Sequence, residues 1–360
     1  MIFNMYSVIR FKIFVLLLVV LSMPVFNSVA APPKKVIVPE PKNYLAITDT
    51  VALVQKPLNL PSLMPMAMIV AQGHLVVANR NAIIFNAYPL PITGSGISGV
   101  HSGRGPGELI AYDLMSFAGD DSGFYVADLD NYYKKFTISG GIISQTAKER
   151  FYNNNDPLNG MIKIKGKFLN CNYNGRKEHP YEFVVLNPDG SKDYIGKVPD
   201  WNKSISDGDV TSIIEYMNCH IAQPGGNRIA VFYCNYRKVR IMNLKGQLLS
   251  ETSINYPTNS SKIPDPKGTY RMYGSACASN TRMVVRVYNS VLSQGGSLSD
   301  RKSTEFQIWD WEGHLLKRMI VKGKIDVFTV DYNTNTFYGL DRDEDSVLYM
   351  ADISKLLNGK

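Results

Sequence analysis

The sequence predicts an all-β protein folded as a six-bladed β-propeller of four-stranded antiparallel blades, and three observations support this. Glycine (28), proline (19) and tyrosine (21) are abundant, and no stretch is rich in helix-favouring residues, which favours strands and turns. A pair of short β-rich segments recurs six times. Glycine-bearing turns follow four of these pairs. Four strands per unit at a period of about 50 residues are typical of propeller blades.

The first strand of each pair begins with a hydrophobic residue and ends before a polar turn. These first strands start at positions 75, 124, 168, 229, 283 and 337, so their spacings are 49, 44, 61, 54 and 54 residues. The second strands cover residues 83–86, 135–138, 183–186, 239–242, 306–309 and 348–351. Such regular self-similarity predicts a repeat architecture. A pair of β-sandwiches would not produce six similar units, and a parallel β-helix has much shorter repeats.

Glycine is the second residue of the turn that follows four of the second strands. These glycines are Gly140, Gly190, Gly246 and Gly313. Because glycine adopts positive φ without strain, each turn closes a tight hairpin onto a third strand, as at residues 247–249 and 314–316. A further strand is expected before each first strand, as at residues 213–222 and 325–330. Each unit therefore contains four strands.

The sixth unit is incomplete, because only residues 353–360 follow its last predicted strand. Residues 47–58 precede the first unit and have the pattern of a strand. We expect them to pair with the sixth blade as its outermost strand, which leaves no open sheet edge where the ring closes.

The first thirty residues have the pattern of a signal peptide. Arg10 and Lys12 precede the uncharged apolar run 13–23, and small residues precede a cleavage site before Ala31. The alternative, an uncleaved membrane anchor, needs about 20 apolar residues. We therefore expect residues 1–30 to be removed, residues 31–46 to be a flexible leader, and residues 47–360 to form a single propeller domain.

Net charge argues against a nucleic-acid partner. The chain carries +8, and removal of two basic residues with the signal peptide leaves 37 − 31 = +6. The basic residues are scattered in pairs rather than in runs, which favours a solvated surface with a weak cationic bias. An anionic glycan partner is the alternative.

The four cysteines do not form a metal-binding or redox motif. Cys171, Cys219, Cys234 and Cys277 lack any C-x-x-C spacing, and an oxidising compartment would allow three disulfide pairings. Cys219 and Cys234 flank a turn and could face each other across a hairpin. The favoured interpretation is that all four are small buried hydrophobic residues. No cysteine follows the apolar run closely enough to carry a lipid anchor.

One unit carries a more specific motif. Residues 103–109 read GRGPGEL, residues 121–128 read DSGFYVAD, and Asn131 leads to the next strand. This unit, residues 103–141, resembles an NHL-type repeat, and its Gly-Pro-Gly-Glu form is similar to the six-bladed NHL-like or TolB-like propellers exported by Bacteroidetes-type bacteria. The resemblance implies an exported propeller and no particular activity. The loop itself is expected to connect two blades, with Glu108 accepting hydrogen bonds from backbone N–H groups.

Candidate ligand-binding residues lie in the loops between the first and second strands of each pair and in the blade connectors, which share one face of a propeller. They are polar and mixed in charge, which suits a ligand and equally suits a solvated rim. The set comprises Arg80, Arg104, Asp128, Asp130, Asn131, Asn172, Arg237, Asn289, Asp341 and Arg342. Residues 341–345 are acidic at four of five positions and could attract Ca²⁺, although they lack the spacing of an EF-hand.

Catalytic motifs are absent from the sequence: the five histidines lack H-x-x-x-H spacing, and there is no G-x-S-x-G elbow. The sequence therefore predicts no catalytic or metal residues and no cofactor, with Ca²⁺ the one ion considered. The predicted function is an exported, periplasmic or secreted binding or scaffold protein, monomeric, without a membrane span after cleavage, that recognises a protein or glycan of the cell envelope. The alternative is a metal-dependent lactonase- or lyase-type enzyme with Ca²⁺ or Zn²⁺ held in the channel by Asp128, Asn172, Asn289 and Asp341.

Overall fold

A computed structural model describes most of the compact unit Pro33–Lys360. The described residues are 34–37, 48–58, 64–92, 95–151, 158, 160–172, 180–201, 216–254, 270–291, 303–344 and 346–358. The predicted signal peptide lies outside them and stays a prediction.

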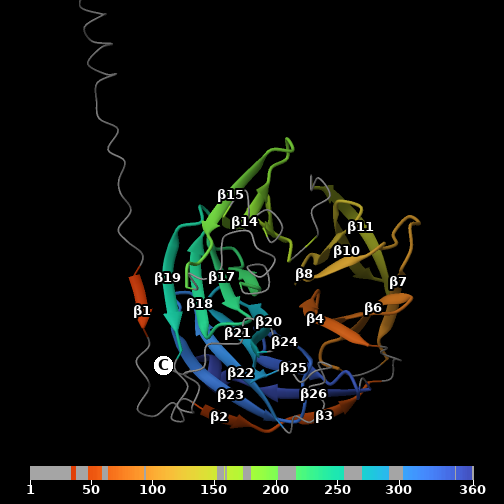
Figure 1. Cartoon of the computed structure of the whole chain (residues 1–360). Helices are drawn as coiled ribbons and strands as arrows, with labels where there is room; N and C mark the ends of the chain where they lie inside the picture. Colours follow the sequence, from red (N-terminus) through yellow and green to blue (C-terminus); the bar gives the residue numbers. More distant parts are fainter. Residues whose placement is uncertain are drawn as a thin grey trace, which may run out of the picture. The chain divides into compact units, whose positions relative to one another are not determined.

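The strands form six sheets, each built on four antiparallel strands, and Figure 1 shows these sheets arranged as a ring. The six-bladed β-propeller is thereby confirmed. Blade 1 contains β4 (Pro65–Ala71), β5 (His74–Asn79), β6 (Ile83–Pro89) and β7 (Ile97–His101). Blade 2 contains β8 (Tyr112–Asp120), β9 (Gly123–Asp128), β10 (Tyr132–Ser139) and β11 (Ile142–Arg150). Blade 3 contains β12 (Ile162–Ile164), β13 (Lys167–Cys171), β14 (Tyr181–Leu186) and β15 (Lys192–Lys197).

The second half of the ring repeats this order. Blade 4 contains β16 (Asn218–Ala222), β17 (Arg228–Tyr233), β18 (Lys238–Asn243) and β19 (Leu248–Ser253). Blade 5 contains β20 (Tyr270–Ala278), β21 (Arg282–Val291), β22 (Ser303–Asp310) and β23 (Leu315–Lys322). Blade 6 contains β24 (Val327–Asp331), β25 (Thr336–Leu340), β26 (Val347–Asp352) and, from the beginning of the chain, β3 (Val54–Pro57).

The repeat found in the sequence corresponds to the two middle strands of each blade. All six predicted first strands lie within β5, β9, β13, β17, β21 and β25, and the second strands lie within β6, β10, β14, β18, β22 and β26. The four turn glycines adopt positive φ, between 58° at Gly140 and 89° at Gly313. This conformation is the reason that glycine is needed at these hairpin turns.

The ring closes as predicted, through pairing of an N-terminal strand with blade 6. Strand β3 pairs antiparallel with β26, with Gln55 opposite Tyr349. The expectation of one strand over residues 47–58 is wrong in its extent, because the chain divides it into two. Strand β2 (Thr48–Val51) instead pairs parallel with β23 of blade 5. Without β2, the outer edge of β23 would have unpaired backbone N–H and C=O groups. Strand β2 pairs with this edge, and the chain then continues to β3 in blade 6.

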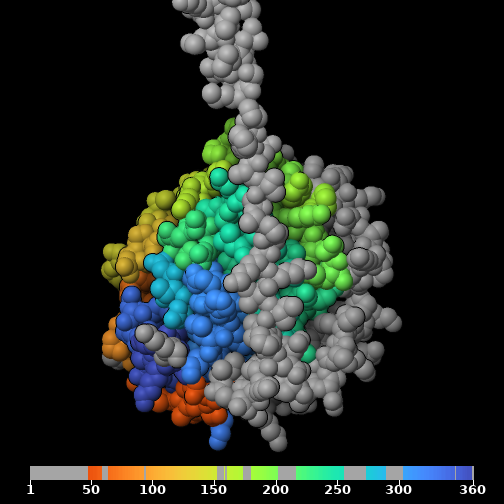
Figure 2. All heavy atoms as spheres, turned by 90° about the vertical axis from the view of Figure 1, so that its left-hand side faces the viewer, coloured from red at the N-terminus to blue at the C-terminus, as the bar shows by residue number. Residues whose placement is uncertain are grey.

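The predicted flexible leader also contains a strand. β1 (Lys34–Ile37) pairs parallel with β19, whereas the flexibility expected of the leader stays a prediction. The N-terminal segment therefore contributes a strand in turn to the outer edges of blades 4, 5 and 6. Side chains hold β2 in place, since the Arg318 Nη1 group donates to Thr48 Oγ1 at 2.8 Å. In Figure 2 residues 48–58 form the orange-red surface below the blue surface of the C-terminal blades.

The hydrophobic core consists of six clusters, one between each pair of neighbouring blades in the described part of the chain. Each middle strand contributes to two of them, because successive side chains point to opposite faces of a sheet. In β21, Val284 packs between blades 5 and 6, whereas Val285 packs between blades 4 and 5. Between blades 1 and 2, Phe85 and Phe124 meet edge to face at 4.9 Å between ring centroids. Burial of each such side chain contributes about 1.5–3 kcal/mol.

The chain ends in a short helix, α3 (Ser354–Asn358). Asp352 caps it, since its Oδ1 atom accepts the N–H of Ser354 at 2.8 Å. Leu356 and Leu357 complete the cluster between blades 5 and 6. Among the described residues, no helix has the length and apolar character needed to cross a membrane.

None of the four cysteines forms a disulfide, and Cys171, Cys219 and Cys234 are buried. Cys219 lies opposite Phe232 in the sheet rather than opposite Cys234. Burial raises the pKa of the Cys219 thiol well above its usual value. The favoured interpretation is therefore confirmed for Cys171, Cys219 and Cys234, whereas Cys277 is only partly buried.

Candidate functional site

The face that carries the blade connectors, here called the connector face, is the predicted ligand face. It comprises the connectors and the loops between the second and third strands of each blade. The two kinds of loop contact each other directly: the Tyr112 hydroxyl donates to the Asn79 carbonyl at 2.5 Å, and the Leu129 N–H donates to the Ala111 carbonyl at 3.0 Å. The connector from blade 1 to blade 2 is thus held by loops of both adjoining blades.

Asp128 ends β9 and is fully buried beneath the connector from blade 1 to blade 2. Its Oδ1 atom accepts the N–H groups of Ala111 and Leu129, both at 2.9 Å. Its Oδ2 atom accepts the N–H of Ile110 at 3.1 Å and the Lys134 Nζ group at 2.7 Å. Both carboxylate oxygens are therefore used to hold the connector in place.

Lys134 joins two of the predicted site residues. Its ammonium group lies 2.7 Å from Asp128 Oδ2 and 2.7 Å from Asp130 Oδ2, and it also donates to the Glu108 carbonyl at 3.1 Å. Burial by itself lowers the pKa of Lys134, but the hydrogen bonds that it donates to Asp128 and Asp130, together with the charges of these carboxylates, outweigh burial and raise it above its usual value. The cluster is a buried structural ion pair with three acceptors around one cation.

Asn131 and Asn172 hold loop backbones at the mouths of two hairpins. Asn131 adopts φ of 65°, and its carbonyl accepts the Phe151 N–H at 3.0 Å. Asn172 is buried, and its Nδ2 group donates to the Tyr181 carbonyl at 3.1 Å. Asparagine tolerates both the left-handed backbone and such side-chain bonds, so both residues have a structural role in these loops.

The glycine-rich loop is a blade connector, as the sequence predicted. Glu108 Oε2 accepts the Gly105 N–H at 2.6 Å, which confirms the predicted bond to the backbone. A Cβ atom at Gly103 would lie 2.1 Å from Glu108 Oε2, so the carboxylate occupies the space that any other residue would need. Arg104 is held between these glycines and is exposed.

The predicted arginines lie at separate positions on the connector face. Arg80 and Arg104 are exposed, and within the described part of the chain no ion pair or hydrogen bond holds their guanidinium groups. Arg237 is half-buried beside the loop that leads into β18. Arg342 Nε donates to the Pro65 carbonyl at 3.0 Å and so links blade 6 to blade 1. Asn289 lies in β21, but its side chain is outside the described residues.

Asp341 belongs to a group of carboxylates around Lys324. The Lys324 Nζ atom lies 3.2 Å from Asp326, 3.2 Å from Asp341 and 2.5 Å from Asp343. Burial lowers the pKa of Lys324, but the hydrogen bonds to Asp343, Asp326 and Asp341, together with the charge of Asp326, raise it by more than burial lowers it. A protein ammonium group therefore occupies the centre of the acidic segment considered for Ca²⁺.

The residues considered for a channel metal do not come together in the described contacts. Asp128 pairs with Lys134 in blade 2, whereas Asp341 pairs with Lys324 beside blade 6. Among the residues that the structure describes, no group of three or more His, Cys, Asp or Glu side chains is arranged to hold a metal ion. A bound metal stays an untested prediction.

Trp201, which lies on the connector from blade 3 to blade 4, is not among the residues predicted from the sequence. Its ring is half-buried and is flanked by Tyr233 and Tyr236, with centroids at 4.6 and 4.9 Å. The Lys238 ammonium lies 4.5 Å from the Trp201 centroid, and the Arg240 guanidinium carbon lies 5.0 Å from it. The one available signal was a tryptophan, one of three in the chain, in a polar connector.

A charge network holds this aromatic group in place. Trp201 Nε1 donates to Glu251 Oε1 at 3.2 Å, and Arg240 Nε donates to Glu251 Oε2 at 2.9 Å. Glu182 lies 3.7 Å from Arg240 and also accepts the Tyr233 hydroxyl. Burial raises the pKa of the Glu251 carboxyl, but the charge and hydrogen bond of Arg240, the charge of Lys238 and the hydrogen bond from Trp201 together lower it by more. We call Trp201, Tyr236, Arg237 and Lys238 the basic-aromatic patch.

The fold and this face define a six-bladed β-propeller with a basic-aromatic patch among its connectors. No family model and no curated protein matches the chain. A member of the DUF4221 family from Bacteroides vulgatus is similar in fold, with a TM-score of 0.56 at 11% identity over 83% of this chain and 95% of that chain. The NHL-like or TolB-like resemblance stays a prediction.

Two further solved structures match with lower scores. A protein from Bacteroides fragilis described as exported has a TM-score of 0.47 at 10% identity, over 84% of this chain and 98% of that chain. Virginiamycin B lyase from Staphylococcus aureus has a TM-score of 0.44 at 10% identity, over 84% of this chain and 99% of that chain.

Proposed function

We propose that this chain is an exported binding protein of the cell envelope that recognises a protein or glycan partner on its connector face. The observation that carries the proposal is the basic-aromatic patch. Trp201 is half-buried there and held between Tyr233 and Tyr236, while Lys238 lies over its ring. Tryptophan, tyrosine and arginine dominate the binding energy of protein interfaces, and aromatic rings also stack on sugar rings.

Pre-organisation supports this role. The Trp201 ring is tied to Glu251, and Glu251 is tied to Arg240, so little side-chain entropy is lost when a partner covers the ring. Exposed Arg80 and Arg104 extend the cationic character of the same face, which favours a partner with acidic groups.

Export is supported by the sequence of residues 1–30, which has the basic, apolar and small-residue regions of a signal peptide. Cell fractionation and N-terminal sequencing test this part of the proposal. A mature protein that begins at Ala31 and is found outside the cytoplasm supports export, whereas a cytoplasmic protein that keeps residues 1–30 refutes it.

Site-specific photo-crosslinking in intact cells tests the ligand face. A photoreactive residue replaces Arg104 or Arg237 on the connector face, and Asp121, in the exposed β8–β9 turn on the opposite face, serves as the matched control. We expect a discrete adduct from the first two positions and none from the third, and mass spectrometry then identifies it as peptide or glycan. Equal adducts from both faces would refute the assignment.

A further inference from the structure

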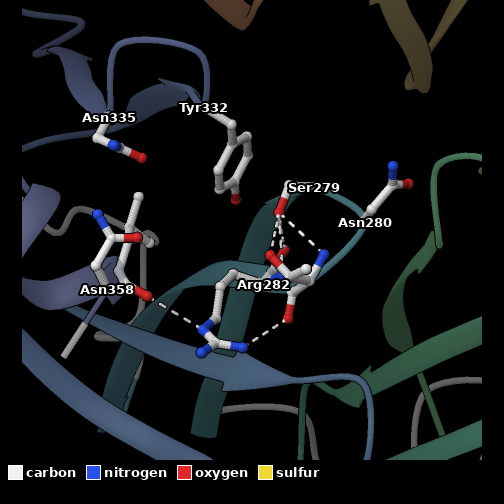
Figure 3. A pocket seen from close by; sticks show the side chains of 8 residues that line it. Ser279, Asn280, Arg282, Tyr332, Asn335 and Asn358 are labelled. Carbon is white, nitrogen blue, oxygen red and sulfur yellow. Dashed lines mark hydrogen bonds between the residues drawn. The ribbon is translucent and has the colours of Figure 1, made fainter. Parts of the chain in front are cut away.

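A cavity of about 320 Å³ lies on the face opposite the connector face. It is formed by the turn between β20 and β21, the turn between β24 and β25, and the end of α3, so that blade 5, blade 6 and the C-terminal helix all contribute. Figure 3 shows its side chains around a common open space. The lining residues are Ser279, Asn280, Thr281, Arg282, Tyr332, Asn335, Leu357 and Asn358.

Arg282 is the single charged residue of this lining. It is half-buried at the start of β21, and two of its three nitrogens are used within the protein. Nε donates to the Leu357 carbonyl at 3.3 Å, and Nη1 donates to the Thr281 carbonyl at 3.1 Å. Among the described residues nothing accepts from Nη2, and no carboxylate pairs with the guanidinium group.

Arg228 occupies the position in blade 4 that Arg282 occupies in blade 5, and it has a carboxylate partner. It begins β17 in blade 4, as Arg282 begins β21 in blade 5. Its Nη1 group donates to the Trp311 carbonyl at 2.7 Å and lies 2.6 Å from Glu312 Oε1. The blade framework thus supplies a carboxylate partner at one of these positions, whereas Arg282 has no carboxylate partner among the described residues and lies beside a cavity.

Polar but uncharged groups make up most of the remaining wall. The side-chain amides of Asn280, Asn335 and Asn358 have no hydrogen-bond partner in the part of the chain that the structure describes. An amide both donates and accepts, so three of them complement a ligand that carries several hydroxyl groups. The Tyr332 hydroxyl is used on the Cys277 carbonyl at 3.1 Å, which leaves its ring, together with Leu357, as the apolar part of the wall.

We propose that this cavity binds a hydroxylated carboxylic acid of single-ring size, of the class that includes the hexuronic acids. The guanidinium group of Arg282 binds the carboxylate, since a planar fork of N–H donors matches its geometry. The asparagine amides bind the hydroxyl groups, and the Tyr332 ring packs against the apolar face of the sugar. A volume of about 320 Å³ is at the small end of the range for ligand sites, which limits the ligand to about one ring.

Calorimetric titration of the purified protein with galacturonate and glucuronate, beside neutral galactose and glucose, tests the proposal. We expect at least one uronate to bind, and the neutral sugars to bind at least about tenfold more weakly because they lack the carboxylate. Arg282→Gln should weaken uronate binding about tenfold or more, and Arg228→Gln should leave it unchanged. Arg282→Lys should fall between, because a lysine keeps the charge and loses the fork.

Arg282 also donates a hydrogen bond to the end of α3, so its substitution removes that bond as well. Asn358→Ala provides a test that does not depend on Arg282. Asn358 is exposed, so its loss leaves the fold intact and is expected to weaken uronate binding about threefold or more. Three outcomes would overturn the proposal: no uronate binding at millimolar concentration, equal binding of neutral sugars, or equal losses in Arg228→Gln and Arg282→Gln. None of these depends on the connector face, so failure here leaves the proposed function untouched.

Discussion

The ammonium group of Lys134 lies 2.7 Å from the carboxylate of Asp128, and both side chains are buried beneath the connector between blades 1 and 2. The same carboxylate accepts three backbone N–H groups from that connector and the adjacent loop. The ion pair therefore ties the connector to blade 2 through backbone hydrogen bonds, and the connector geometry depends on the charge of Asp128 as much as on its shape.

Substitution of Asp128 should be strongly destabilising. Asp128→Asn keeps the shape but leaves the buried Lys134 ammonium with one fewer counter-charge, and we expect the free energy of unfolding to fall by about 3 kcal/mol. Asp121→Asn, in the exposed β8–β9 turn, should change it by less than about 0.5 kcal/mol. Urea unfolding of both variants measures the difference. Equal stabilities would show that the ion pair does not hold the connector.

The glycine-rich connector gives a second prediction, based on the contact between Gly103 and Glu108. Gly103→Ala places a methyl group 2.1 Å from Glu108 Oε2 and so displaces the carboxylate from the Gly105 N–H. We expect a loss of about 1–2 kcal/mol. In a Glu108→Ala background the same substitution should lower the free energy of unfolding by clearly less, because the methyl group then has no carboxylate to displace. Additive losses in a double-mutant cycle would contradict this account.

Stability should fall in mild acid because of His220, which is buried on β16 and packs against Phe183 at 5.0 Å between ring centroids. Its Nε2 group donates to the Gly160 carbonyl at 2.6 Å. Burial lowers the pKa of His220 from 6.5 to about 4, although the bond to Gly160 opposes this. The unfolded chain therefore binds the proton more tightly, and stability is lost as the pH falls from about 6.5 to about 4.

Between pH 7 and pH 5 this residue alone should lower the free energy of unfolding by about 2 kcal/mol. His220→Gln should remove that part of the pH dependence, even if the variant is less stable at pH 7. Urea midpoints at the two pH values, for the wild type and the variant, make the comparison. An unchanged fall in the variant would assign the acid sensitivity to other groups.

Ring closure by β3 predicts a sharp difference between two truncations. A chain that begins at residue 31 keeps β1, β2 and β3, whereas a chain that begins at residue 59 loses all three and exposes the edges of β19, β23 and β26. We expect the first to remain folded and monomeric, and the second to associate through its open edges and to melt at a lower temperature. Light scattering after size exclusion measures this, and two equally monomeric proteins would rule out a closing role for β3.

Trp201→Ala should abolish the crosslinking of the envelope partner to a photoreactive residue at position 104 or 237. The reason is that loss of an interface tryptophan typically weakens binding tenfold or more. Ile142→Ala, at an exposed hydrophobic residue in the β10–β11 hairpin away from the connector face, is the matched control and should have no effect. Thermal unfolding of both variants checks that each is folded. Undiminished crosslinking in Trp201→Ala would remove the patch from the proposed interface.

Much of the fold could be predicted because the middle strands of each blade are buried on both faces. Strands such as β17, with Ile229, Val231 and Phe232 all buried, produce short hydrophobic runs that recur at each blade. Glycines at the hairpin turns mark the boundary to the outer strand, since positive φ leaves few alternatives. The role of Glu108 could also be predicted, because its bond spans only three residues of one loop.

The site was harder to predict, because its contacts join residues far apart in the chain. The environment of the Trp201 ring is formed by Lys238, Arg240 and Glu251, and no local sequence pattern indicates that these residues meet it. Asp128 and Asp341 stood out as polar loop residues, yet Lys134 and Lys324 pair with them in the structure. The cavity beside Arg282 likewise requires two blades and the C-terminal helix to be placed together.

The amino-acid sequence by itself thus determined the number of blades, the hairpins within them and the strand that closes the ring, because these follow from local hydrophobic periodicity and turn chemistry. Only the tertiary structure decided the pairing of residues 34–37, 48–51 and 54–57 with three blade edges, and which charged side chains remain available to a ligand. Edge pairing and ion pairing depend on which groups meet in space, and backbone hydrogen bonds at an open edge accept almost any extended segment.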